Sequence, residues 1–222
     1  MVNMRSPTSG ESSDLNTRAR IRAAAIRCFG EEGFDVGMRA IAAEAGVSPA
    51  SIIKHFGSKE RLRAECDERV FGQIFDLKRD SVADPSNPAV FLAQLDRMAE
   101  YTPLVTYVLR SLLAGGDYAR RFIEQTVADT LEYFALGVEA GTIRPSRDET
   151  ARARYLVMSS FGALLLELSL DHANDLSRFG PTWERYGEQI TLPVLELFTE
   201  GLLADRAMLD AYLEHRGEPD AS

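Results

Sequence analysis

Residues 38–57 read MRAIAAEAGVSPASIIKHFG and predict two short helices joined by a tight turn. The apolar residues of 38–45 recur at the spacing of one helix face. Gly46 can end this helix in the left-handed conformation. Ser48 can then cap a second helix, over about 49–55, by accepting a backbone N–H. Two short helices in this order are typical of a helix-turn-helix.

Helical periodicity continues on both sides of this pair. A helix is expected before it, from Asn16 or Thr17 to Gly33, and another after it, from Ser58 to about Asp80. A turn cluster over 84–88 is followed by further helical patterns. No run of β-branched residues with period-two alternation interrupts them, so the fold class is all-α. The later helices are expected at about 88–100, 102–114, 117–140, 147–172, 181–203 and 205–215.

The charge of the chain is distributed unevenly. Its net charge is −9, but residues 1–69 carry 11 Lys and Arg against 10 Asp and Glu, whereas residues 70–222 carry 14 against 24. Such asymmetry suggests two regions with different partners. The charge of the first region permits DNA binding but is not evidence for it. We expect a flexible arm over 1–14, a three-helix domain with the helix-turn-helix over 15–62, a larger helical domain over 63–216, and a disordered tail over 217–222.

Several classes of protein are disfavoured by composition. Two cysteines, Cys28 and Cys66, cannot build a disulfide framework, and the three histidines share no metal-ligand spacing with them. No apolar run reaches the roughly 20 residues of a membrane helix, and no secretory signal is apparent. Gly-rich phosphate loops and nucleophile motifs are missing. We expect a cytoplasmic protein without metal or cofactor, without membrane contact, and not an enzyme.

The stretch from Asn16 to about Val70 resembles the DNA-binding domain of TetR-family transcriptional regulators. Four segments carry the resemblance: 29–34 (FGEEGF), 38–42 (MRAIA), 45–48 (AGVS) and 55–62 (HFGSKERL). Two positions depart from the family pattern. Ile53 stands where a tyrosine is usual, and Gly37 where Ser or Thr is usual, which puts the affinity for DNA in doubt rather than the class.

The resemblance implies which residues contact double-stranded DNA. Alternatives stay open: His55 can be a partly buried core residue, and Arg18, Arg20 and Arg22 fit a solvated helix face better than a phosphate site. For Arg39, Lys54 and Lys59 an ordinary surface charge is the less favoured alternative. The implied contacts are Arg39, Ser48, Pro49, Ala50, Ser51, Ile53, Lys54, His55 and Lys59.

The acidic region has to supply dimerisation, because a two-fold dimer is what reads two DNA half-sites. The two long helices over 147–172 and 181–203 are the candidates, and Pro193 should kink or break the second. An intrachain core role is the alternative. The expected interface residues are Ser159, Ala163, Leu166, Leu170, Tyr186, Ile190 and Leu197.

The remaining helices can enclose a small, mostly apolar effector, since aromatic residues and methionine suit such a ligand. Ordinary core packing is the alternative for each residue. The expected lining is Phe71, Phe75, Met98, Tyr101, Tyr107, Phe122, Phe134 and Phe161. Together these features indicate a homodimeric repressor that binds a palindromic operator and is released by this ligand. A helical ligand-binding or adapter protein with a weakened DNA head, or a helical enzyme, are the alternatives.

Overall fold

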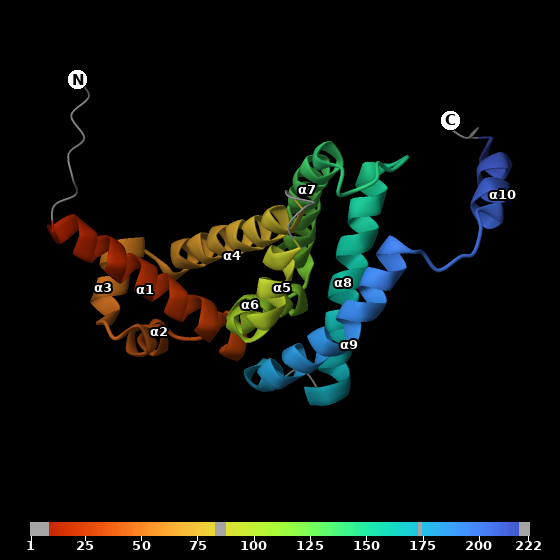
Figure 1. Cartoon of the computed structure of the whole chain (residues 1–222). Coiled ribbons are helices and arrows are strands. Elements are labelled where there is room, and N and C mark those ends of the chain that lie inside the picture. Colours follow the sequence, from red (N-terminus) through yellow and green to blue (C-terminus); the bar gives the residue numbers. More distant parts are fainter. Residues whose placement is uncertain (1–8, 83–87, 173–174, 218–222) are drawn as a thin grey trace, which may run out of the picture. The chain divides into compact units, whose positions relative to one another are not determined.

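The structure, a computed structural model, describes residues 9–82, 88–172 and 175–217. Within these ranges all regular structure is helical and no strand occurs, which confirms the all-α class. The described chain forms two compact units, one ending at Glu184 and one beginning at Arg185. Figure 1 labels the helices along the chain.

The first helix, α1 (Ser9–Glu32), begins earlier than predicted. Neither Asn16 nor Thr17 starts it, so residues 9–14 of the expected flexible arm are helical, while 1–8 lie outside the described residues. The reason is local. The Thr17 Oγ1 donates to the Ser13 carbonyl four residues earlier, at 3.0 Å, which is the bond of a threonine inside a helix rather than of a cap.

The predicted helix-turn-helix is present as α2 (Met38–Ala45) and α3 (Pro49–Phe56). Gly46 ends α2 with φ +62°, as predicted, in the left-handed region that glycine adopts without steric cost. The Ser48 Oγ accepts the Ser51 N–H at 3.2 Å and caps α3. With α1, these helices form the DNA head, the name used below for residues 15–62.

The core of the DNA head is closed around large apolar residues. Ile21, Phe29, Ile41, Ile52 and Leu62 have no exposed surface. This core extends beyond the head without a break, because buried residues of a later helix, α6 (Thr102–Leu113), belong to the same cluster. α1 packs along α6.

Two contacts fix α1 against α6. A Cβ at Gly30 would lie 3.1 Å from the Tyr107 backbone nitrogen, so only glycine lets the helices approach this closely without adjustment. The Arg110 guanidinium donates from Nε to the Gly30 carbonyl at 3.0 Å and from a terminal nitrogen to the Glu31 carbonyl at 2.7 Å. These carbonyls lie in the last turn of α1, where helix carbonyls lack intrahelical partners.

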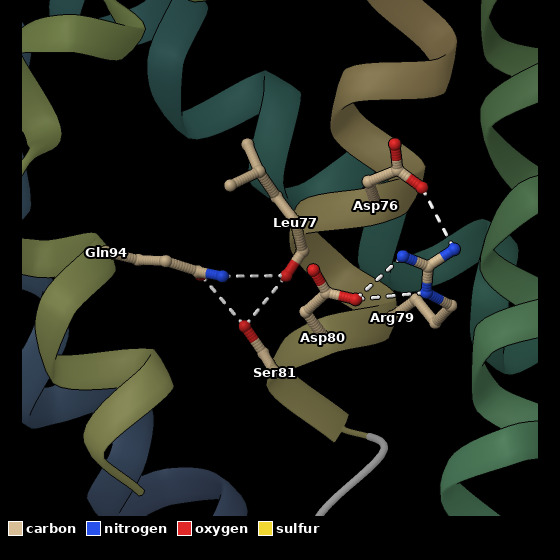
Figure 2. Close-up of polar contacts among 6 residues, drawn as sticks. All are labelled: Asp76, Leu77, Arg79, Asp80, Ser81 and Gln94. Atoms are coloured by element: carbon tan, nitrogen blue, oxygen red, sulfur yellow. Dashed lines mark hydrogen bonds and ion pairs between the residues drawn. The ribbon is translucent and has the colours of Figure 1, made fainter.

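The long helix α4 (Lys59–Val82) leads out of the head toward α7 (Gly116–Ala140), as Figure 1 shows, and packs against it. Polar contacts hold its far end (Figure 2). The Gln94 Nε2 donates to the Leu77 carbonyl at 3.0 Å, and the Ser81 hydroxyl donates to the Gln94 Oε1 at 2.9 Å. Arg79 pairs with Asp76 and Asp80 on α4 itself. Gln94 therefore joins the last turns of α4 to the next helix through the Leu77 carbonyl and the Ser81 hydroxyl.

The helix predicted over 88–100 is divided into α5 (Ala89–Asp96) and a 3-10 helix, η1 (Met98–Tyr101). α8 (Glu149–His172) and a short 3-10 helix, η2 (Leu176–Arg178), follow α7. By length and composition, residues 149–170 of α8 could cross a membrane, with a mean hydropathy of 1.3. α8 packs against α6, α7 and η2, as a helix of a globular domain does.

The last helices are α9 (Phe179–Thr199) and α10 (Ala207–Arg216). α9 runs through Pro193 without a break, and it ends before the predicted limit at 203. α10 ends at Gly217, which adopts φ +70°. The rest of the predicted tail, 218–222, lies outside the described residues.

Candidate nucleic-acid interface

The exposed side of α3 carries most of the residues expected to contact DNA. Ile52 and Phe56 anchor the helix in the core of the head, while Pro49, Ala50 and Lys54 face solvent. Helix N-termini present free N–H groups and attract phosphate. The neighbouring helix α2 adds Arg39, which is exposed. Of the other expected contacts, Ile53 is exposed, and Ser51 and Lys59 are half-buried.

His55 differs from the other expected contacts. Its side chain is only 6% exposed, and its Nε2 lies 3.6 Å from the Asp14 carboxylate of α1. This burial favours the alternative of a partly buried core histidine. The same carboxylate lies 3.6 Å from the Lys54 Nζ. Asp14 therefore places a negative charge beside a lysine that is expected to contact phosphate.

Arg18 has a structural role that the sequence pattern did not indicate. It forms an ion pair with Glu65 of α4 and donates to the His55 carbonyl at the end of α3 at 2.5 Å. Its guanidinium also lies 4.7 Å from the Phe56 ring centroid. One side chain of α1 thus holds the C-terminal end of α3 against α4.

Arg20 and Arg27 make similar connections between α1 and α2. The Arg20 Nε donates to the Ala45 carbonyl at the end of α2 at 3.1 Å, and Arg27 pairs with Glu44 at 2.6 Å. Arg20 is exposed and Arg18 half-buried, so both lie at a solvated face, but each side chain also binds a neighbouring helix. A pattern of basic residues on one helix cannot reveal partners that lie on other helices.

Tyr107 and Asp67 connect α6 with α4. The Tyr107 hydroxyl donates to an Asp67 carboxylate oxygen at 2.6 Å, and Tyr107 is fully buried. Burial raises the pKa of the Asp67 carboxyl above its usual range, although the bond from Tyr107 and the charge of Arg63 act to lower it. Burial likewise raises the pKa of the Cys66 thiol to about 12, so this cysteine is not a reactive thiolate at neutral pH.

The eight residues expected to line an effector pocket are divided between two clefts of the described residues or lie outside both. Phe71 and Phe122 line a cleft of about 810 Å³, with their ring centroids 4.8 Å apart. The Phe161 ring contacts Phe122 at a centroid distance of 5.9 Å, with the ring planes tilted by 56°. Tyr101 lines a second cleft of about 440 Å³. Tyr107 belongs to the core instead. Neither cleft is lined by Phe75, Met98, Tyr107, Phe134 or Phe161.

On α8, the residues expected at a dimer interface form an apolar face that is largely exposed to solvent. Leu166 and Leu170 are 66% and 80% exposed, Ser159 is exposed and Ala163 is half-buried. In the unit that begins at Arg185, Leu197 of α9 is exposed, whereas Tyr186 and Ile190 are half-buried. Within the described residues no group of three or more His, Cys, Asp or Glu side chains could hold a metal ion.

Comparisons with known proteins agree with this arrangement. Residues 21–66 match the family model described as bacterial regulatory proteins, tetR family, and residues 99–204 match the one described as tetracyclin repressor-like, C-terminal domain. The HTH-type transcriptional regulatory protein RaaS of Mycobacterium tuberculosis is 44% identical over 211 residues, which cover 95% of this chain and 98% of that protein.

Solved structures share the fold at lower identity. A TetR transcriptional regulator from Chloroflexus aurantiacus has a TM-score of 0.53 at 23% identity, covering 80% of this chain and 97% of its own. SmeT, the repressor of a Stenotrophomonas maltophilia multidrug efflux pump, has a TM-score of 0.51 at 22% identity, covering 80% and 89%. On the strength of the RaaS match and the two family models, this chain belongs to the TetR family of transcriptional regulators, DNA-binding proteins that are not enzymes.

Proposed function

We propose that the chain is a homodimeric, cytoplasmic repressor that binds a palindromic operator and is released from it by a small, mostly apolar ligand. The observation that carries the proposal is that α3 exposes one side and its capped N-terminus to solvent while its other side is buried. Its Ser48-capped N-terminus and exposed side are free to enter a major groove, while Ile52 and Phe56 fix its other side in the core. Arg18 and Arg20 hold the helix-turn-helix rigidly without using its exposed face.

The dimer is supported by the uncovered leucines of α8. Exposed apolar residues that gather on one helix face mark interaction surfaces. A two-fold dimer places two α3 helices in successive major grooves, and its symmetry requires a palindromic site. The aromatic lining of the larger cleft supports a ligand with apolar character.

The DNA flanking the gene that encodes this chain is the first duplex to test, against a random duplex at two salt concentrations. We expect tight and salt-sensitive binding, because each phosphate contact releases counterions. Arg39→Ala and Lys54→Ala should each weaken binding by about tenfold, which corresponds to about 1.4 kcal/mol. Arg97→Ala and Lys78→Ala, exposed positions outside the head, are the matched controls and should leave the affinity unchanged.

Asp14→Asn tests the same interface in the opposite direction. Removing the carboxylate 3.6 Å from the Lys54 Nζ should strengthen binding a few-fold at low salt, with less effect at high salt. Equal affinity for flanking and random duplex, together with no effect of Arg39→Ala or Lys54→Ala, would contradict a working DNA head. That result would favour a helical ligand-binding or adapter protein.

A further inference from the structure

The larger cleft lies at the place where the DNA head meets the remaining helices. Phe34 and Asp35 contribute from the corner between α1 and α2, Arg63 and Phe71 from α4, and Phe122 from α7. Its volume of about 810 Å³ falls in the range that accommodates small molecules. Any molecule in this cleft contacts the head, α4 and α7 together.

Arg63 is the distinctive residue of this cleft. Its guanidinium carbon lies 3.3 Å from the Phe34 ring centroid and 3.8 Å from the Tyr118 ring centroid. The two rings cover the flat faces of the guanidinium, so only its N–H edge can receive a further partner. Among the described residues Arg63 donates no hydrogen bond and forms no ion pair, and its Nε is buried without a partner. A buried donor without a partner carries a desolvation penalty.

The neighbouring acids neutralise this guanidinium only in part, since the charges of Arg63 and Asp67 attract each other. Asp67 lies one turn further along α4, but its carboxylate accepts the Tyr107 hydroxyl, and no ion pair with Arg63 is formed between these described residues. The other acids of the lining are exposed, where water and salt screen their charge. They are Asp35, Glu60 and Glu68. Lys59, which is half-buried, and Arg121, which is exposed, are the further cations of the lining.

We propose that this cleft binds a small anionic molecule with an apolar body, whose carboxylate accepts hydrogen bonds from the edge of Arg63. Planar guanidinium groups match carboxylates in a bidentate geometry. The stacked rings of Phe71 and Phe122 offer the apolar body an adjoining surface. The inference extends the proposed function by giving the effector a site and a chemical class. It rests on the proposed function only where it implies that the bound anion releases the protein from its operator.

The test compares 2-naphthoate with 2-naphthamide, which has the same ring system without the charge. Calorimetry on the full-length protein without DNA measures both affinities. Naphthoate should bind the unmodified protein and Arg63→Gln should weaken it at least tenfold, or about 1.4 kcal/mol. Arg69→Gln is the matched control, because Arg69 lies on the same helix and lines the other cleft. Naphthamide should bind more weakly than naphthoate and should not respond to Arg63→Gln.

Equal affinities for naphthoate and naphthamide, no naphthoate binding, or an unchanged Arg63→Gln affinity would each overturn the proposal. If Arg63→Gln does not fold, hydrogen exchange of the unmodified protein decides. Naphthoate should then slow the exchange of the backbone amides of residues 59–71 and 118–125. Slower exchange confined to residues 149–170 would contradict this site. Operator binding measured without naphthoate tests the regulator separately, so the DNA head can prove functional even if the cleft does not bind the anion.

Discussion

The DNA head and the C-terminal helices bury their apolar residues to very different degrees. Ile21, Phe29 and Ile52 of the head have no exposed surface. On α8 and α9, by contrast, large apolar residues such as Leu170 and Phe198 remain mostly exposed. A helix that leaves one apolar face uncovered lacks the packing that stabilises most helices in proteins. The head is therefore completed by its own chain, whereas the C-terminal helices leave apolar surface exposed, as the proposed dimer requires.

The largest expected effect comes from charging the uncovered face of α8. Leu166→Arg combined with Leu170→Arg should convert the proposed dimer to a monomer and weaken operator binding by about a hundredfold, since each head then binds its half-site without a linked partner. Folding of the single chain should persist because both leucines are exposed. Light scattering after gel filtration measures the mass. Leu92→Arg, at an exposed leucine of α5, is the control, and a dimer that survives the double substitution would exclude this interface.

Truncating one phenylalanine in each region sharpens the contrast. Phe29→Ala should lower the free energy of unfolding by about 3–5 kcal/mol, as expected for a fully buried phenylalanine. Phe198→Ala, at a residue that is 65% exposed, should cost little in dilute protein and more as concentration rises, if α9 contributes to the dimer. Urea unfolding at several protein concentrations distinguishes the two. A concentration-independent loss for both would remove the proposed difference.

A smaller effect separates stability from DNA binding at α3. Ser48→Ala removes the oxygen that accepts the Ser51 N–H and should destabilise the head by about 1 kcal/mol. Ser48→Asp should keep the cap and the stability, but it places a negative charge where phosphate is expected and should weaken duplex binding. Thermal unfolding and duplex titration of both variants give the answer. Unchanged duplex binding by Ser48→Asp would place the DNA away from this helix end.

The smallest expected effect is on the pH dependence of the free energy of unfolding, through Asp67, which connects α4 with α6. Because burial raises the pKa of the Asp67 carboxyl, the folded chain binds more protons than the unfolded chain, and this group's contribution to stability falls as pH rises from about 4 through the folded pKa. Asp67→Asn should therefore gain stability relative to the unmodified chain over this interval. Urea titrations across the pH range measure it. A difference between the two proteins that does not change with pH would contradict a raised pKa of the Asp67 carboxyl.

Short-range signals explain why the helix-turn-helix could be predicted. Gly46 and Ser48 act on backbone groups within a few residues of themselves, so their pattern is readable without tertiary information. Thr17 misled because a threonine serves both as a cap and within a helix. The Arg18–Glu65 pair joins residues 47 positions apart, and only the folded chain brings them together.

The expected effector residues show the same limit. Aromatic side chains at helical spacing suit a core as well as a pocket, and Tyr107 proved to be core. Arg63 carried no signal in the sequence, because its importance depends on Phe34 and Tyr118, which lie on other parts of the chain. The sequence alone therefore predicted the type of interface but not the residues that hold it in place.

The close approach at Gly30 limits how far this regulator can be treated as modular. A chimera that joins residues 1–62 to the C-terminal part of another family member would place a foreign surface where the Tyr107 backbone and the Arg110 guanidinium now meet the end of α1. A head transplanted without α6 would leave part of its own core open to water. Productive exchange of DNA specificity should instead change the exposed residues of α3 and leave α1 in place.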